Sequence, residues 1–531
     1  MLLGYAVQDV RSAEDRVRAG LPDGALMQRA ARGLAEVVAA RMTEHGKELG
    51  LGGRDPRVVV LAGPGDNGGD ALWAASYLAG ADDDYSPDVA VVGIAASLHP
   101  AGLAAAGDAD VPVHHVDPGD THLPDEVERL IHGADLVVDG LLGIGGRPGL
   151  RGAMALAVDA VPRSAYLLSV DLPSGADPEG LVRPERMVHA DETVTFGMLK
   201  PVHLLPATEP AVGTLTVVDI GVQMDVPPVV ERLERHDVAR LWPVPTNSDH
   251  KYTRGVLVVV AGSEGYPGAA VLTAAAAVAA GAGMVRYLGP RRAEDLVLAA
   301  CPEVVPGPGQ SQAGVVGPGV AAQVCNHPDC DDGQVGMVRE ILADDVPLVV
   351  DAGGLDLLTI WLGQGHRRTA PTLLTPHAGE LARMLTALGT SEDDAGDGED
   401  AAREEADGHG CEVTREAVEA DPLEHARRAA QLTGCTLLLK GSTTLVVDPD
   451  PAVPARSQAD APAWLATAGA GDVLAGLAGT LLAAGLTPRD AGSLAALVHG
   501  VAADRANPGG PVRALAVAHA IPSTVAHLLR R

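Results

Sequence analysis

Aromatic side chains are scarce in this sequence. They make up only 2% of its 531 residues, and Phe occurs once. The hydrophobic cores must therefore be built from Ala, Val and Leu. Proteins that bind single-stranded nucleic acid stack the bases on aromatic side chains, so this scarcity argues against that class of function.

Positive charge is also in short supply. The sequence has 39 Lys and Arg residues against 70 Asp and Glu residues, which gives a net charge of −31. Such a surface repels phosphate backbones and anionic membranes, and we expect neither nucleic acid nor a membrane as a partner. An anionic small molecule would need backbone N–H groups and helix N-termini to supply local positive potential.

Cysteine is rare, and an odd, small number of cysteines indicates a reducing compartment. Because no charged-then-apolar leader follows Met1, we expect a cytoplasmic protein. Cys325 and Cys330 are spaced like zinc ligands, but no second pair lies nearby, which disfavours zinc. The Ala-rich run 269–283 is broken by glycines and predicts a buried helix rather than a membrane span. The cysteines are Cys301, Cys325, Cys330, Cys411 and Cys435.

Short β-rich runs alternate with helical stretches along the chain, which is typical of α/β folds with parallel sheets. The predicted strands are 57–62, 88–94, 135–139, 166–171 and 213–220, then 255–261, 284–288, 347–351, 372–375 and 436–440. The predicted helices are 25–42, 70–80, 268–281, 334–343, 378–387, 472–484 and 490–505.

The segment 222–232, with its Pro227–Pro228 pair, is the best candidate for a domain boundary. We therefore expect two α/β domains, residues 1–225 and 226–531, since a chain of this length usually splits into several domains. Residues 391–410 are acidic, Gly-rich and almost free of large apolar side chains. They predict a mobile surface insertion.

Residues 62–70, Ala-Gly-Pro-Gly-Asp-Asn-Gly-Gly-Asp, follow a predicted strand and open a helix. The glycines let the backbone turn tightly and bring N–H groups to a ligand, and a helix N-terminus favours negative charge. A tight strand-to-helix connection would have the same composition. Two further stretches, 139–147 and 171–175, also follow strands and strengthen the functional interpretation.

Loops at the carboxyl ends of parallel strands converge on one crevice. We expect that crevice to gather the polar side chains of Asn67, Asp70, Asp139, Asp171 and Ser174. Oxygen ligands of this kind suit a hard cation, and carboxylates suit proton transfer. Each Asp alone would more commonly cap the helix that follows it, but three such loops in one domain favour a site.

Over about residues 1–225 the chain resembles the NAD(P)H-hydrate epimerase family, the YjeF N-terminal domain. The resemblance lies in Leu26–Ala31, the DNGGD stretch 66–70, Asp139 with its Gly-rich loop, and the DLPSG stretch 171–175, in the family's order. It implies a potassium ion at Asn67, Asp139 and Ser174. The implied contacts to the damaged cofactor are Asp66, Asn67, Gly68, Gly69, Asp70, Gly143, Ile144, Gly145, Gly146, Arg147, Pro148, Gly149 and Asp171.

The chemistry that this resemblance implies is inversion at the hydroxyl-bearing carbon of the hydrated nicotinamide ring. Asp171 is then the candidate proton-transfer group. The chain departs from the family at two positions. Asp66 stands where the family usually has Asn, and Ala71 stands where it commonly has Gly.

The strongest signal in the second half is Leu465–Gly476, which contains Gly469-Ala470-Gly471-Asp472 at the start of a long helix. Free N–H groups at such a helix start form an anion hole for a transferring phosphoryl group, and Asp472 is placed to accept a proton from an attacking hydroxyl. An Asp that merely caps its helix is the commoner case for one motif alone.

Further loops support a phosphoryl-transfer site and belong together on a ribokinase-like three-layer scaffold. Lys440 and the hydroxyls after it could face nucleotide phosphates, and His377 lies where a strand enters a helix, as a ligand contact or as a histidine satisfied by the helix start. The loops are 262–270, 317–319, 374–380 and 440–444.

Over about residues 230–531 the chain resembles the ADP/ATP-dependent NAD(P)H-hydrate dehydratase family. The marks are His250-Lys251, GYPGAA, GPG, TPHAGE, KGSTT and ATAGAGDVLAG. The resemblance implies that Ala270, Gly319, His377 and Asp472 contact the hydrate. The implied nucleotide contacts are Lys440, Gly441, Ser442, Thr443, Thr444 and Gly471.

The implied reaction is a kinase step turned into an elimination. Asp472 helps remove the hydroxyl proton, Mg²⁺ is expected at the phosphates of ADP or ATP, and the ring nitrogen's electron pair expels phosphate. One departure is Gly353, where the family commonly has a second Asp. The whole chain thus resembles bifunctional NAD(P)H-hydrate repair enzymes, and we expect a homo-oligomer. The alternative is a ribokinase-like small-molecule kinase with an N-terminal binding or interaction domain.

Overall fold

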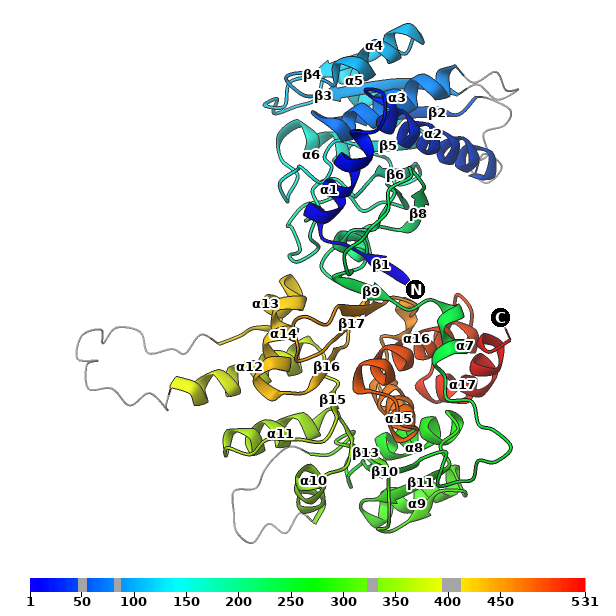
Figure 1. Cartoon of the computed structure of the whole chain (residues 1–531), viewed down its shortest axis with the longest axis vertical. Coiled ribbons are helices and arrows are strands. Elements are labelled where there is room, and N and C mark those ends of the chain that lie inside the picture. Colours follow the sequence, from blue (N-terminus) through cyan, green and yellow to red (C-terminus); the bar gives the residue numbers. More distant parts are fainter. Residues whose placement is uncertain (46–54, 81–86, 322–332, 394–411, 531) are drawn as a thin grey trace, which may run out of the picture. The chain divides into compact units, whose positions relative to one another are not determined.

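The computed structural model describes residues 1–45, 55–80, 87–321, 333–393 and 412–530 (Figure 1). Their contacts divide the chain into two compact units, Leu3–Val230 and Met1–Leu2 with Glu231–Arg531. The division falls a few residues after the boundary that we place at 225. Cys325, Cys330 and all but the start of the 391–410 insertion lie outside the described residues.

The unit Leu3–Val230 is built on a seven-stranded sheet in the order β4-β3-β2-β5-β6-β7-β8, in which all neighbours run parallel. Val58–Ala62 are apolar at every position and buried, as suits a strand covered on both faces. The chain order switches between β2 and β5, so the loops after these two strands open a crevice. The strands are β2 (Arg57–Ala62), β3 (Asp88–Ile94), β4 (Val113–Val116), β5 (Leu136–Gly140), β6 (Tyr166–Val170), β7 (Glu192–Phe196) and β8 (Thr214–Val218).

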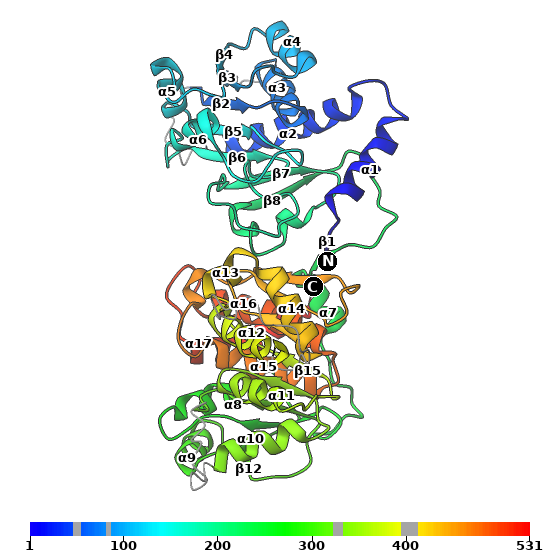
Figure 2. The same cartoon turned by 90° about the vertical axis from the view of Figure 1, so that its left-hand side faces the viewer.

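Helices cover both faces of this sheet and make three layers. Val58 and Val60 pack with α2 and α3, whereas Val59 and Leu61 pack with α5 and α6, because successive strand residues point to opposite faces. Figure 2 shows α2 and α3 on one side of these strands and α5 and α6 on the other. The helices are α1 (Val7–Arg18), α2 (Ala25–His45), α3 (Asp66–Ala79), α4 (Pro100–Asp108), α5 (Asp125–His132) and α6 (Gly152–Asp159).

The second unit has a larger sheet in the order β12-β11-β10-β13-β14-β15-β16-β17-β18, continued by β9 (Val230–Arg232) and β1 (Leu2–Gly4). Neighbours are parallel from β12 to β16 and antiparallel from β16 to β18. The strands are β10 (Val256–Val260), β11 (Met284–Leu288), β12 (Val305–Pro306), β13 (Ala313–Val316), β14 (Leu348–Val350), β15 (Thr372–Leu374), β16 (Thr436–Leu439), β17 (Thr444–Val447) and β18 (Ala455–Gln458).

Two helical layers also enclose this sheet. Figure 1 shows α10, α11, α12 and α14 on one side of it and α8, α15, α16 and α17 on the other. The small residues of α15 allow close packing, since a Cβ at Gly476 would lie 2.2 Å from the carbonyl oxygen of Thr273 in α8. The helices are α7 (Val238–Leu241), α8 (Pro267–Ala279), α9 (Arg291–Ala300), α10 (Gly333–Ala343), α11 (Gly353–Gly363), α12 (Ala378–Asp393), α13 (Arg415–Ala420), α14 (Pro422–Thr433), α15 (Ala470–Ala483), α16 (Pro488–Ala506) and α17 (Ala514–Leu528).

These layers confirm the predicted α/β class with two three-layer units. The run 269–283 forms most of the largely buried helix α8, as predicted. Among the described residues, no helix combines the length and apolarity needed to cross a membrane. One prediction of local structure was wrong. Residues 66–70 are the first turn of α3 rather than a loop before it.

Candidate active sites

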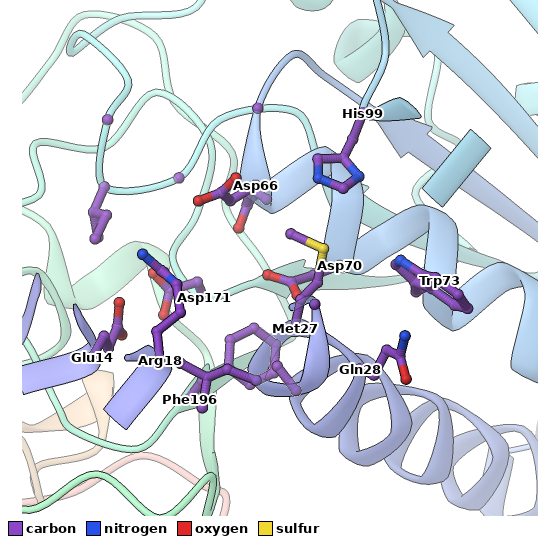
Figure 3. Close-up of a pocket in the computed structure, with 18 of the residues that line it drawn as sticks. Glu14, Arg18, Met27, Gln28, Asp66, Asp70, Trp73, His99, Asp171 and Phe196 are labelled. Atoms are coloured by element: carbon purple, nitrogen blue, oxygen red, sulfur yellow. The ribbon is translucent and has the colours of Figure 1, made fainter. Parts of the chain in front are cut away.

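A cavity of about 1050 Å³ opens beside the switch between β2 and β5. Residues of α1, α2 and α3 line it together with the loops after β5 and β6 (Figure 3). Its predicted members are Asp66, Asn67, Asp70, Gly143, Ile144, Gly145, Gly146 and Asp171. The unpredicted members include Arg11, Glu14, Arg18, Trp73, His99 and Phe196.

The N-terminus of α3 is shaped by glycine. Gly65 has a φ of 89°, and a Cβ on Gly68 would lie 2.0 Å from the carbonyl oxygen of Gly63. The helix therefore starts directly against the turn that follows β2. Its first N–H groups supply the local positive potential that an anionic ligand needs in an acidic protein.

Five of the residues predicted to contact the cofactor do not line the cavity in the described structure, and neither do the predicted metal ligands Asp139 and Ser174. Gly68 packs on the backbone of Gly63, Gly69 packs near His99 and Met27, and the Gly149 N–H donates to the carbonyl oxygen of Gly175 at 2.8 Å. Gly68 and Gly69 thus shape the start of α3, and Gly149 fixes the loop after β5. The five are Gly68, Gly69, Arg147, Pro148 and Gly149.

Asn67, Asp139 and Ser174 come together beside the cavity. Asp139 is buried, and its Oδ2 accepts hydrogen bonds from the Ser174 backbone N–H at 2.9 Å and the Ser169 hydroxyl at 2.8 Å. The Ser174 hydroxyl accepts from the Leu142 N–H at 2.8 Å. The next residue, Gly143, lies against Asn67, whose buried Nδ2 has no partner among the described residues.

Asp171 lies at the centre of a buried polar network. Its Oδ1 accepts from Lys200 Nζ at 2.5 Å and from the Thr195 hydroxyl at 3.0 Å. His203 Nδ1 accepts from the Lys200 N–H at 3.0 Å, which leaves Nε2 to donate to the Asp171 carbonyl oxygen at 2.7 Å. Burial alone would raise the pKa of Asp171, but the Lys200 charge and hydrogen bond bring that pKa below its usual value.

Asp70 has the opposite electrostatic surroundings. Burial raises its pKa well above the usual value, and the charges of Asp171, Asp66 and Glu14 raise it further. Its Oδ1 is shielded from solvent and has no hydrogen-bond partner among the described residues. The cavity thus holds one carboxyl that favours the ionised form and one that favours the protonated form.

A second polar cluster lies at the carboxyl ends of β14, β15 and β16 in the second unit. Lys440 Nζ lies 2.7 Å from Asp351 Oδ1 and 3.6 Å from Glu380 Oε2. Asp351 also accepts from the Thr375 hydroxyl at 2.9 Å. The Glu380 carboxylate accepts from the His377 backbone N–H at 2.8 Å, so strand ends far apart in sequence meet around one ammonium group.

The start of α15 joins this cluster. An ideal Cβ on Gly471 would lie 3.5 Å from Lys440 Nζ and 4.0 Å from Asp351 Oδ2. Burial first, and then the charge of Asp351, raise the pKa of Asp472 to about 7, while Lys440 lowers it. Asp472 is therefore poised to take up a proton near neutral pH.

The Gly-rich loops after β10 and β13 meet next to this helix start. A Cβ on Gly262 would lie 2.8 Å from Ala270 Cβ, and a Cβ on Gly319 would lie 2.6 Å from Ala269 Cβ. The side chain of Leu272 approaches Gly469. Ala270, Gly319 and the 469–472 turn therefore border the same end of the sheet.

The remaining predicted residues lie on the loops after β15 and β16. His377 pairs with Lys440 in a short parallel bridge, and its side chain is 55% exposed beside Glu380. Gly441 and Ser442 are exposed, whereas Thr443 is buried and Thr444 begins β17. His377 thus lies beside the start of the 440–444 segment.

Sequence reasoning missed the groups that support the predicted ones. Lys200, Thr195 and His203 had drawn no attention, although a lone Lys in an apolar stretch after a strand is a usable signal. Asp351 and Glu380 belonged to recognised stretches but had been given no role. In each case the partner lies far away in the sequence.

Comparisons with known proteins match both units. Residues 23–202 match the family model described as "YjeF-related protein N-terminus", and residues 257–522 match the one described as "NAD(P)H-hydrate dehydratase". The chain is 40% identical to the "Bifunctional NAD(P)H-hydrate repair enzyme Nnr" of Mycobacterium tuberculosis over 503 residues, covering 92% of this chain and 90% of that protein. The chain belongs to the bifunctional NAD(P)H-hydrate repair enzyme family.

A second member of the repair enzyme family, from Mycobacterium leprae, is 40% identical over 518 residues, covering 95% of this chain and 94% of that protein. Among solved structures, the ADP/ATP-dependent NAD(P)H-hydrate dehydratase from Bacillus subtilis co-crystallized with ATP/Mg²⁺ is 22% identical. The structural alignment covers 58% of this chain and 100% of the Bacillus subtilis chain, with a TM-score of 0.45.

The two family matches coincide with the two groups of polar residues. The region matching the YjeF-related model contains Asn67, Asp139, Asp171 and Lys200. The region matching the hydrate dehydratase model contains the whole cluster around Lys440. Each half of the repair enzyme family thus has its own candidate site in this chain.

Proposed function

We propose that this chain repairs hydrated NADH and NADPH in two reactions. The first unit interconverts the R and S hydrates, and the second dehydrates the S hydrate to NAD(P)H with consumption of ADP or ATP. The observation that carries this proposal is full-length similarity to bifunctional repair enzymes, combined with one polar cluster in each unit. Family membership favours this function over the alternative of a small-molecule kinase with an N-terminal binding domain.

In the dehydration, Asp472 accepts the proton of the ring hydroxyl while that oxygen attacks the terminal phosphoryl group of the nucleotide. Its raised pKa of about 7 suits a general base, because the best pKa for such a base lies near the pH at which it works. The ring nitrogen's electron pair then expels phosphate to give an iminium ion, and loss of a proton from the adjacent ring carbon restores the dihydronicotinamide. N–H groups at the start of α15 and the Lys440 ammonium group stabilise the negative charge on the transferring phosphoryl group.

In the second unit, each ligand is assigned to the residues that the sequence predicts to contact it. We assign the hydrate to Ala270, Gly319, His377 and Asp472. The nucleotide is assigned to residues 440–444 and Gly471. Glu380, a buried carboxylate 3.6 Å from Lys440 Nζ, is an oxygen ligand that fits Mg²⁺. When bound, Mg²⁺ neutralises charge on the phosphates.

In the first unit the cavity receives the hydrate, and Asp171 is the proton-transfer group for inversion at the hydroxyl-bearing carbon. The anionic part of the substrate is assigned to the N-terminus of α3, at residues 66–70, and to the loop 143–149. Arg11 Nη2 donates to the Ile144 carbonyl oxygen at 2.6 Å. This hydrogen bond holds α1 against the loop 143–149, and both line the cavity.

A potassium ion is assigned to Asn67, Asp139 and Ser174. The chemistry of the set supports the fit, because it offers carboxylate, amide and hydroxyl oxygens, which are hard-cation ligands. The unpartnered atom of Asn67 is its amide nitrogen, which donates hydrogen bonds, so the amide oxygen would be the ligand. Burial raises the pKa of Asp139, and a neighbouring cation would favour its ionised form.

The division of labour follows the predicted domains. We assign epimerisation to residues 1–225 and dehydration to residues 226–531. A cytoplasmic location, a homo-oligomeric state, and the absence of nucleic-acid or membrane partners stay predictions. Cell fractionation and light scattering on the purified chain test the first two.

The decisive experiment mixes purified protein with both epimers of NADH hydrate, K⁺, Mg²⁺ and either ADP or ATP, and follows dihydronicotinamide absorbance. Recovery of both epimers that depends on nucleotide supports two working sites. Recovery of the S hydrate alone, beyond spontaneous exchange, would contradict the epimerase assignment. A stable phosphorylated product in place of NADH would instead support the kinase alternative.

A further inference from the structure

The polar groups around the N-terminal cavity are arranged unequally about two of its carboxyls, the buried Asp171 and the half-buried Asp70. Asp171 Oδ1 accepts hydrogen bonds from the Lys200 ammonium group at 2.5 Å and from the Thr195 hydroxyl at 3.0 Å. Asp70 Oδ1 receives no hydrogen bond among the described residues. Both carboxyls line the same cavity, and Figure 3 shows them bordering one open space together with Asp66 and Glu14.

Lys200 is unusual because its side chain is only 1% exposed. A buried ammonium group is costly unless it is paired, and its partners are Asp171 and Thr195, which lies 3.1 Å away. The network also holds the Asp171 backbone, which has a φ of 65° in the left-handed region. His203 fixes that conformation from its carbonyl side at 2.7 Å, since a non-glycine residue adopts it only where its surroundings compensate the strain.

Resting on the proposed epimerase function, we propose that Asp171 and Asp70 act as a base and an acid on one substrate, and that Lys200 is the positioning residue that fixes these roles. Lys200 and Thr195 engage one oxygen of Asp171 and leave the other for the substrate. Asp70 lines the cavity, and because its Oδ1 is shielded and unpartnered, its other oxygen is the one that delivers a proton. Pairs of carboxyls whose surroundings separate their protonation behaviour mark acid and base roles.

The step that this division serves is the opening of the carbinolamine ring. Asp171 takes the proton of the ring hydroxyl, the oxygen's electron pair forms a carbonyl, and the bond from that carbon to the ring nitrogen breaks. The nitrogen receives the electrons of the broken bond and a proton from Asp70. Ring closure on the other face of the carbonyl reverses each transfer, so the epimer forms and both carboxyls return to their starting states.

The pH dependence follows from the charges that face the two carboxyls. The rate needs Asp171 ionised and Asp70 protonated, which gives an acidic limb and an alkaline limb. Lys200 lowers the pKa of Asp171 and also that of Asp70. Without Lys200, both limbs should therefore move to higher pH. The charged or titratable groups around the pair are Arg11, Glu14, Asp15 and Arg18 of α1, Asp23, Asp66 of α3, His99, Lys200 and His203.

The test measures exchange of purified R hydrate into S hydrate by the full-length chain, without nucleotide, between pH 5 and 9, with spontaneous exchange subtracted. The wild type comes first, because a wild type that does not accelerate exchange refutes the proposed epimerase rather than this assignment. Lys200→Met should lower the rate at neutral pH about 100-fold or more and move both limbs upward. A reduced rate with unmoved limbs would show that Lys200 has only a structural role.

Two further variants keep the test decisive if Lys200→Met fails to fold. Thr195→Val removes one donor to Asp171 at constant shape and should move the acidic limb in the same direction, by less. Asp70→Asn should lower exchange about 100-fold or more and abolish the alkaline limb, and wild-type exchange in this variant overturns the acid role. Glu36→Gln, at an exposed carboxyl of α2 outside the cavity lining, is the matched control and should leave both limbs in place.

Discussion

At the scale of single residues, Asp472 carries the dehydration. It opens α15 beside Lys440 and Asp351, where burial has raised its pKa to about 7. Asp472→Asn keeps the side-chain shape but removes the proton acceptor. We expect dehydration of the S hydrate to fall by about 100- to 10,000-fold, measured as NADH formation at saturating nucleotide. Unchanged exchange between R and S hydrates in the same sample is the control, and retained dehydration would remove this role from Asp472.

The pKa of Asp472 also predicts a pH profile. Because the base acts in its ionised form, kcat/KM for dehydration should rise as pH passes through about 7 and level off above it. The Asp351 charge raises this pKa, so Asp351→Asn should move the midpoint to lower pH, whatever its effect on the plateau. An unmoved midpoint in Asp351→Asn would show that another group controls the limb.

Elements were predicted well where the pattern is local. The bounds of β2, β3 and β11 agree with the prediction, because unbroken runs such as Val58–Leu61 stand between polar segments. β7 was missed because three of its five residues, Glu192, Thr193 and Thr195, are polar, whereas a strand covered on both faces is usually a continuous apolar run. Its polar side chains are buried because their partners come from elsewhere, with Glu192 bound by Arg41 at 2.6 Å and Thr195 by Asp171 at 3.0 Å.

The residues of the candidate sites were likewise predicted where their sequence pattern is local. The motif residues were predicted because Gly, Asp and Asn at strand ends form recognisable stretches. Lys200 was not, because nothing in Met198–Pro201 shows that its side chain reaches Asp171, which comes 29 residues earlier. The first turn of α3 was mistaken for a loop because two glycines are poor helix formers, and only the close approach to Gly63 explains them.

That close approach gives a prediction at the scale of one element. Gly68→Ala would place a Cβ 2.0 Å from the Gly63 carbonyl oxygen, so the start of α3 must shift away from the turn after β2. We expect a loss of about 1–3 kcal/mol in the free energy of unfolding of this unit, measured by urea titration, together with slower epimerisation. Gly80→Ala, at the end of the same helix with its nearest atom at 3.4 Å, is the control and should change stability by about 0.5 kcal/mol or less. Equal effects of the two substitutions would contradict the packing argument.

At the scale of the whole molecule, the two candidate sites are built from separate parts of the chain. The residues lining the cavity all lie within Leu3–Val230, and the cluster around Lys440 lies within Glu231–Arg531. A dehydratase that accepts only the S hydrate leaves the R hydrate unrepaired. An epimerase in the same chain therefore makes the whole hydrate pool available to one dehydration site.

This separation predicts complementation between chains. Asp171→Asn should recover the S hydrate and leave the R hydrate to spontaneous exchange, and Asp472→Asn should recover neither. If the hydrate passes between sites through solution, an equimolar mixture of the two variants should recover both epimers, at a rate approaching half that of the same total concentration of wild type. The readout is the amplitude and rate of NADH absorbance from an R,S mixture with ADP or ATP. A mixture that recovers only the S hydrate would mean that both sites must belong to one chain, because the R hydrate would then reach the dehydratase only by transfer within a molecule.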